Sequence, residues 1–189
     1  MDELLRIVCF GPDYGMRNIY QCIYWIFAYN VCVFTAVTGS GIRYDDLLKS
    51  ILLRMSFRKF WIRMELCIFI ICFICTIVII VPAMFFQRLY NDAVAVWVTY
   101  LINVFFVASV TKVIEFFRGK TVAFSVTVFG SVITIVCWSH GVGFSRTIPW
   151  SYGIMSSYVP EKIVIQILAV VFFCLMSKKI VAYQMANER

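Results

Sequence analysis

Five stretches of at least 15 residues in this chain contain no Asp, Glu, Lys or Arg. They cover residues 18–42, 66–87, 93–111, 121–145 and 163–177, and their lengths are 25, 22, 19, 25 and 15 residues. An α-helix needs roughly 20 apolar residues to cross the hydrocarbon core of a bilayer. One charge at the centre of such a helix costs about 2.5–3.5 kcal/mol, which offsets roughly six good apolar residues. The absence of charge from every stretch therefore predicts transmembrane segments.

The composition of the chain agrees with this interpretation. Of its residues, 62% are hydrophobic and 14% are charged, whereas soluble domains average about 45–50% apolar and about 25% charged. A soluble domain of this size must cover itself with polar side chains, and too few are present. Stretches such as "CIFIICFICTIVIIVP" also lack the alternation of a transmembrane β-strand. The predicted fold class is therefore an all-α integral membrane protein.

The charge-free stretches set the expected spans of this protein. We expect a single transmembrane helical domain over residues 1–189, a bundle of five helices at about 19–39, 64–86, 93–111, 121–141 and 162–178. The last charge-free stretch gives only about 22 Å of helix at 1.5 Å per residue, against roughly 30 Å of hydrocarbon. If this segment does not cross, the bundle has four transmembrane helices.

The connection between the first two spans, residues 42–63, has the pattern of a basic amphipathic helix. Apolar residues recur at helical spacing from Leu47 to Met55, and Asp45 and Asp46 suit a helix start. The residues expected to face the membrane surface are Lys49, Arg54, Arg58 and Lys59. Such a helix lies in the plane of the interface. The alternative is a cytosolic loop whose apolar side packs on the bundle.

The distribution of basic residues predicts an orientation. With the N-terminus outside, the cytosolic segments hold 12 of the 17 Lys and Arg residues and the outer segments hold five. This bias follows the positive-inside rule. It places the N-terminus on the outer or lumenal side, and the C-terminus in the cytosol if there are five spans. Anionic lipid headgroups account for the basic excess, so no nucleic-acid partner is expected.

Two asparagines lie near the centres of predicted spans. They are Asn30 in the first span and Asn103 in the third, and Thr99 precedes Asn103 by one turn. An amide in hydrocarbon needs a partner, and hydrogen bonds between membrane helices contribute about 0.6–2 kcal/mol. We expect these side chains to face the bundle interior, where the two amides are candidates to bond each other. For these side chains, a structural contact between helices is favoured over a role in ligand binding.

The fourth span carries small residues at helical spacing. Its predicted packing face consists of Ala123, Thr127, Gly130 and Thr134. Small residues allow helices to approach closely. This face is expected to pack either within the bundle or against a partner protein.

The eight cysteines do not form a pattern that indicates a metal site. All but Cys9 lie inside the charge-free stretches. Cys72 and Cys75 have the spacing of half a zinc site, but the one histidine, His140, lies far along the chain. Thiols in an apolar segment usually act as small apolar side chains. We therefore predict no metal, cofactor-binding or catalytic residues.

These features favour a non-catalytic role. A catalytic site needs a nucleophile or paired acid and base groups within reach, and one histidine and ten scattered acids do not indicate one. We expect a multi-pass membrane protein that acts by helix–helix packing as a scaffold, trafficking adaptor or assembly adaptor. Its expected partners are the lipid bilayer and another membrane protein or a second copy. One alternative is a channel-forming or channel-accessory subunit, and another is a small membrane-embedded lipid-modifying enzyme.

Overall fold

The computed structural model describes residues 19–40, 57–87, 93–140, 164–165, 167–176 and 179. Every regular element in these ranges is an α-helix, and none of these residues lies in a strand. The long helices are α2 (Ile19–Gly39), α4 (Phe57–Gln87), α5 (Ala93–Arg118) and α6 (Lys120–Ser139). A further apolar helix, called the short helix below, covers Ile167–Met176. The all-α prediction is confirmed for the described part of the chain.

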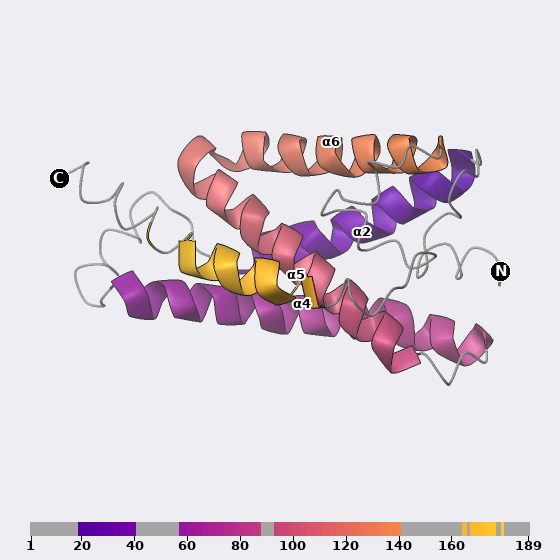
Figure 1. Cartoon of the computed structure of the whole chain (residues 1–189), viewed down its shortest axis with the longest axis horizontal. Helices are drawn as coiled ribbons and strands as arrows, with labels where there is room; N and C mark the ends of the chain where they lie inside the picture. The colour runs from indigo at the N-terminus through magenta and orange to yellow at the C-terminus, as the bar shows by residue number, and fades with distance from the viewer. Residues whose placement is uncertain are drawn as a thin grey trace.

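Successive long helices run in alternating directions (Figure 1). The end of α2, the start of α4 and the turn between α5 and α6 all lie toward the left of the view. Contacts join α5 to α6, α4 and α2, and join α2 to α4 and α6. The short helix lies beside α5, because the ring of its Phe173 contacts Phe106 at 5.7 Å. Within the described ranges, four helices are long and apolar enough to cross a membrane.

The start of α4 corrects one prediction. Residues 57–63 form its first turns rather than part of a separate interfacial helix. This segment contains no glycine or proline to interrupt a helix, so the helix continues from the basic segment into the apolar one. Arg58 and Lys59 therefore belong to α4, while Lys49 and Arg54 lie outside the described residues. At 31 residues, α4 is about 46 Å long, longer than the hydrocarbon core.

The end of α5 corrects a second boundary. The charge criterion ends the third span at residue 111, before Lys112, but the helix continues to Arg118. Charge was a poor marker of the helix end, because the Lys112 side chain turns into the bundle and bonds within it. The first and fourth long helices agree closely with the spans expected near 19–39 and 121–141.

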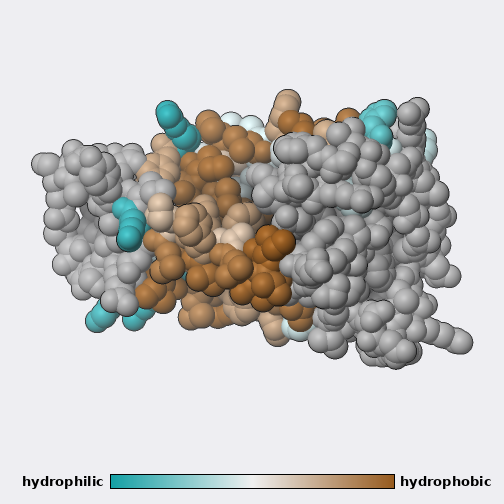
Figure 2. Space-filling model, viewed as in Figure 1, coloured by the Kyte–Doolittle hydropathy of each residue, from teal (hydrophilic) through white to brown (hydrophobic). Residues whose placement is uncertain are grey.

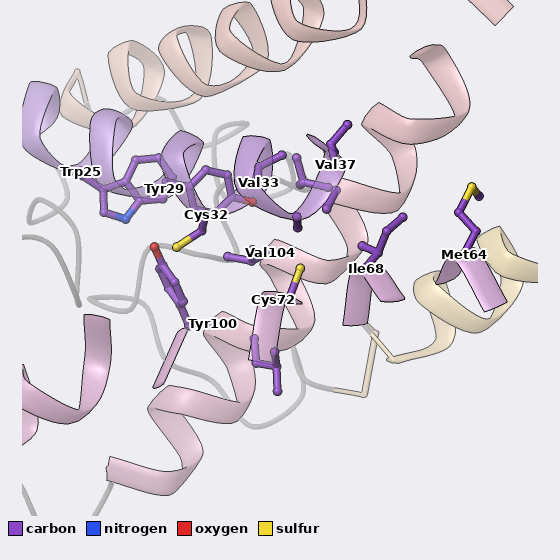
Figure 3. Close-up of a cluster of buried hydrophobic side chains, with 14 of the residues drawn as sticks. Trp25, Tyr29, Cys32, Val33, Val37, Met64, Ile68, Cys72, Tyr100 and Val104 are labelled. Atoms are coloured by element: carbon purple, nitrogen blue, oxygen red, sulfur yellow. The ribbon is translucent and has the colours of Figure 1, made fainter. Parts of the chain in front are cut away.

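The core of the bundle contains aromatic rings as well as aliphatic side chains (Figure 3). Trp25 stacks on Tyr29 with ring centroids 4.7 Å apart, and Tyr29 meets Tyr100 of α5 edge-on at 6.0 Å. Offset and edge-on ring pairs are the favourable arrangements. The thiols of Cys32 and Cys72 are buried in the same cluster. This cluster joins α2, α4 and α5.

A single residue, Gly119, separates α5 from α6. Its backbone angles are φ 83° and ψ 167°, a region that essentially only glycine adopts. The Gly119 N–H donates to the Glu115 carbonyl at 2.9 Å, and the Gly119 carbonyl accepts from the Ala123 N–H at 3.2 Å. The chain therefore reverses between the two helices without a loop, which brings α6 back along the bundle (Figure 1).

Candidate functional site

The interior of the bundle contains polar side chains that join the helices to one another. The first contact joins α2 and α5, where the Tyr29 hydroxyl donates to the Asn103 side-chain oxygen. Asn103 is 1% exposed. Thr99, one turn earlier on the same helix, is also buried. Two of the residues singled out in the sequence thus lie on the inward face of α5.

Asn30 joins α2 to a different helix. Its side-chain oxygen accepts from the Ser131 hydroxyl of α6 at 3.4 Å, and its Nδ2 donates to the Ile26 carbonyl at 2.8 Å. Both asparagines therefore face the interior, but these bonds link α2 to α5 and to α6 rather than forming an Asn30–Asn103 pair. Neither Ser131 nor Tyr29 had been singled out in the sequence. Ser131 lies four residues after Thr127, a spacing that could have indicated it.

The small-residue face of α6 lies inside the bundle. Ala123, Thr127 and Thr134 are buried, and Gly130 is half-buried. The Thr127 hydroxyl lies 2.6 Å from that of Thr111 on α5. Of the two locations expected for this face, the structure shows packing within the bundle, against α5 and α2.

One lysine side chain is also buried in the bundle. Lys112 is 2% exposed, and its Nζ lies 3.0 Å from the Glu115 carboxylate. The same Nζ donates to the Val37 carbonyl, in the last turn of α2, at 3.4 Å. A cation is favourable there because the carbonyls at the end of a helix carry partial negative charge. Lys112 thus stabilises the end of α2 from a neighbouring helix.

A partly buried carboxyl contact joins α4 and α5. The Ser109 hydroxyl donates to Glu65 Oε2 at 2.7 Å. The second oxygen, Oε1, is buried and has no hydrogen-bond partner among the described residues. The sequence did not indicate this contact, because Glu65 and Ser109 are 44 positions apart. A further polar contact, from Trp97 Nε1 to the Thr76 hydroxyl at 3.2 Å, joins the same two helices.

The described cysteines are distributed through the bundle as free thiols. In the described ranges, no group of three or more His, Cys, Asp or Glu side chains is placed to hold a metal ion. Cys32 and Cys72 contribute to the apolar core described above.

The Tyr29–Asn103 contact provides a direct test of these interhelical bonds. A double-mutant cycle with Tyr29→Phe and Asn103→Leu should give a coupling energy of about 0.6–1.7 kcal/mol. The measurement is unfolding in detergent, monitored by the change in tryptophan fluorescence. As a control, Tyr29→Phe should combine additively with Thr76→Val, within about 0.5 kcal/mol, because Thr76 bonds Trp97 instead. A coupling as small as that of the control would contradict the Tyr29–Asn103 contact.

Comparisons of this chain with protein-family models, curated proteins and solved structures find no match. The structure itself defines a class. The chain is all-helical in its described part, with four helices long and apolar enough to cross a membrane, and polar side chains join these helices in the interior.

Proposed function

We propose that the protein is a non-catalytic, multi-pass integral membrane protein that acts by lateral helix packing, as a scaffold or as an adaptor in trafficking or assembly. The distribution of side chains carries this proposal. Phe27 on α2 is 70% exposed and Phe129 on α6 is 69% exposed, whereas Ser131 is fully buried. Figure 2 shows apolar side chains over much of the described surface. Such exposure is unfavourable in water and carries no comparable penalty in lipid.

The exposed charges support the orientation expected from the sequence. Lys59 and Arg63 lie in the first turns of α4, and Arg118 and Lys120 flank Gly119. All four side chains are exposed, and both segments lie toward the left end in Figure 1. Hydrophilic side chains gather at that end in Figure 2. By the positive-inside rule, this end of the bundle faces the cytosol.

The polar contacts favour packing over conduction. A pore would need Asn30 and Asn103 to face a water-filled path, and in the structure these amides bond Ser131 and Tyr29. Their hydrogen-bonding capacity thus serves to hold the bundle together. The outward faces of α2, α4 and α6, which carry the exposed apolar side chains, remain available to lipid or to another transmembrane protein.

Photo-cross-linking in native membranes tests the proposed role. We would replace Phe27 or Phe129, both directed outward, by the photoreactive analogue benzoylphenylalanine. Phe34 on α2, which stacks on Phe124 of α6 at 4.4 Å, is the matched inward control. We expect a discrete protein adduct from at least one outward position and none from Phe34.

The outcomes of this experiment separate the candidate functions. A saturable adduct with a different protein, or with a second copy of the chain, supports a packing role. Adducts with lipid alone from both outward positions would contradict it. A homo-oligomer that conducts ions after reconstitution into liposomes would instead establish the channel alternative.

A further inference from the structure

The carboxyl group of Glu65 is placed unusually for a membrane helix. Glu65 lies on α4 after the exposed Arg63 and immediately before the charge-free stretch of residues 66–87. Its side chain turns toward α5, where Oε2 accepts a hydrogen bond from Ser109, a residue that is 1% exposed. The other oxygen, Oε1, is buried and receives no hydrogen bond from the described residues.

Among the described residues, the neighbours of this carboxyl do not supply a counter-charge. Two thiols lie within electrostatic range of it, those of Cys72 on α4 and of Cys174 on the short helix. Lys112 is three positions after Ser109 on α5, but its Nζ bonds Glu115 and the Val37 carbonyl. No described Lys or Arg forms an ion pair with Glu65. The short helix contacts α5 one turn before Ser109, where the ring of Phe173 meets that of Phe106.

An ionised carboxylate in this position is energetically unfavourable. Burying an unpaired charge costs far more than burying a neutral polar group, and one hydrogen bond from Ser109 satisfies only Oε2. A proton on Oε1 removes the charge and leaves the Ser109 bond unchanged. We propose that Glu65 is a proton-binding site, held as a neutral carboxylic acid between α4, α5 and the short helix. This inference rests on the proposed residence of the chain in a bilayer.

A neutral acid in an apolar site has a distinctive reactivity toward lipophilic carbodiimides. The acid proton moves to one carbodiimide nitrogen, and a carboxyl oxygen bonds to the central carbon as one C=N π bond breaks. The O-acylisourea so formed rearranges when its acyl group moves to nitrogen, giving a stable N-acylurea. No group leaves, so the modified peptide gains the mass of the whole reagent. The site is thus detectable in the unaltered chain.

The experiment treats the full chain, in native membranes at neutral pH, with dicyclohexylcarbodiimide and maps the adducts by mass spectrometry. Glu65 and Glu115 are the two acids of the described residues, and Glu115 is the control because it is paired with Lys112 at 3.0 Å. We expect at least about tenfold more adduct at Glu65 than at Glu115. A water-soluble carbodiimide should not show this preference. The E65Q variant, which keeps Cys72 and Cys174, should lose the adduct.

The control outcomes distinguish this inference from the proposed function. If the chain stays in the membrane after carbonate washing but Glu65 reacts no more than Glu115, the proton-binding site is refuted and membrane residence stands. If carbonate washing releases the chain, membrane residence is refuted, and the inference fails with it. Because the labelling is measured on the wild-type protein, the result does not depend on whether E65Q folds.

Discussion

Replacement of Lys112 by methionine should destabilise the bundle by about 3–5 kcal/mol, the cost typical of removing one partner from a buried ion pair. Methionine keeps most of the length of the side chain but removes its charge. The substitution leaves Glu115, whose side chain is 13% exposed, without its lysine partner, and it removes the donor to the Val37 carbonyl. The effect should appear as a lower midpoint of unfolding in detergent.

Two controls separate charge pairing from loss of packing. The double variant K112M/E115Q removes both charges and should recover part of the lost stability, because no buried charge then lacks a partner. K59M removes an exposed lysine in the first turns of α4 and should change stability by no more than about 0.5 kcal/mol. If K112M unfolded at the wild-type midpoint, Lys112 would have no role in holding α2 against α5.

Replacement of Gly119 by alanine should have the second large effect, a loss of about 1–3 kcal/mol. Gly119 has φ 83° and ψ 167°, and an added Cβ would meet no atom within 4 Å. The cost is therefore backbone strain alone and not a clash. Because this residue alone separates α5 from α6, relieving the strain would change the angle at which α6 returns to the bundle. Unfolding in detergent and protease sensitivity of the turn at Gly119 would both report the change.

Gly39 provides the matched comparison for this substitution. It is helical, so alanine there gains up to about 1 kcal/mol of helix propensity. An added Cβ would lie 2.9 Å from Ile71 Cδ1, the end of a flexible side chain that can shift. We therefore expect G39A to be much better tolerated than G119A. Equal stability of the two variants would show that the turn between α5 and α6 does not require a glycine.

The positions of the long helices could be predicted because the bilayer criterion is local. A charge-free stretch of sufficient length is visible in the sequence without knowledge of any contact, and it located α2 and α6 closely. The criterion failed at Phe57 and Arg118, where α4 begins and α5 ends. Charged residues can continue a helix, either by extending beyond the hydrocarbon or by bonding inside the bundle, and neither arrangement is encoded locally.

The polar contacts between helices could be predicted less well from the sequence. Asn30 and Asn103 could be predicted as interior contacts because amides are rare in apolar spans. Their partners could not, because these lie 101 and 74 positions away in the sequence. Tyrosine is common in membrane helices, so Tyr29 carried no distinguishing signal, and the only signal for Ser131 was its spacing of four residues from Thr127. The Glu65–Ser109 contact spans 44 positions. Which hydroxyl meets which amide or carboxyl depends on helix packing, and packing is a property of the whole bundle.

The crossing of α6 is the most direct test of membrane residence. Lys120 and His140 lie at its two ends, and both side chains are exposed. Single K120C and H140C variants would be treated with a membrane-impermeant maleimide in sealed, right-side-out vesicles, with the unaltered chain as the background. We predict that H140C reacts in intact vesicles and that K120C reacts only after permeabilisation. Equal reaction of both variants in intact vesicles would contradict a helix that crosses the bilayer.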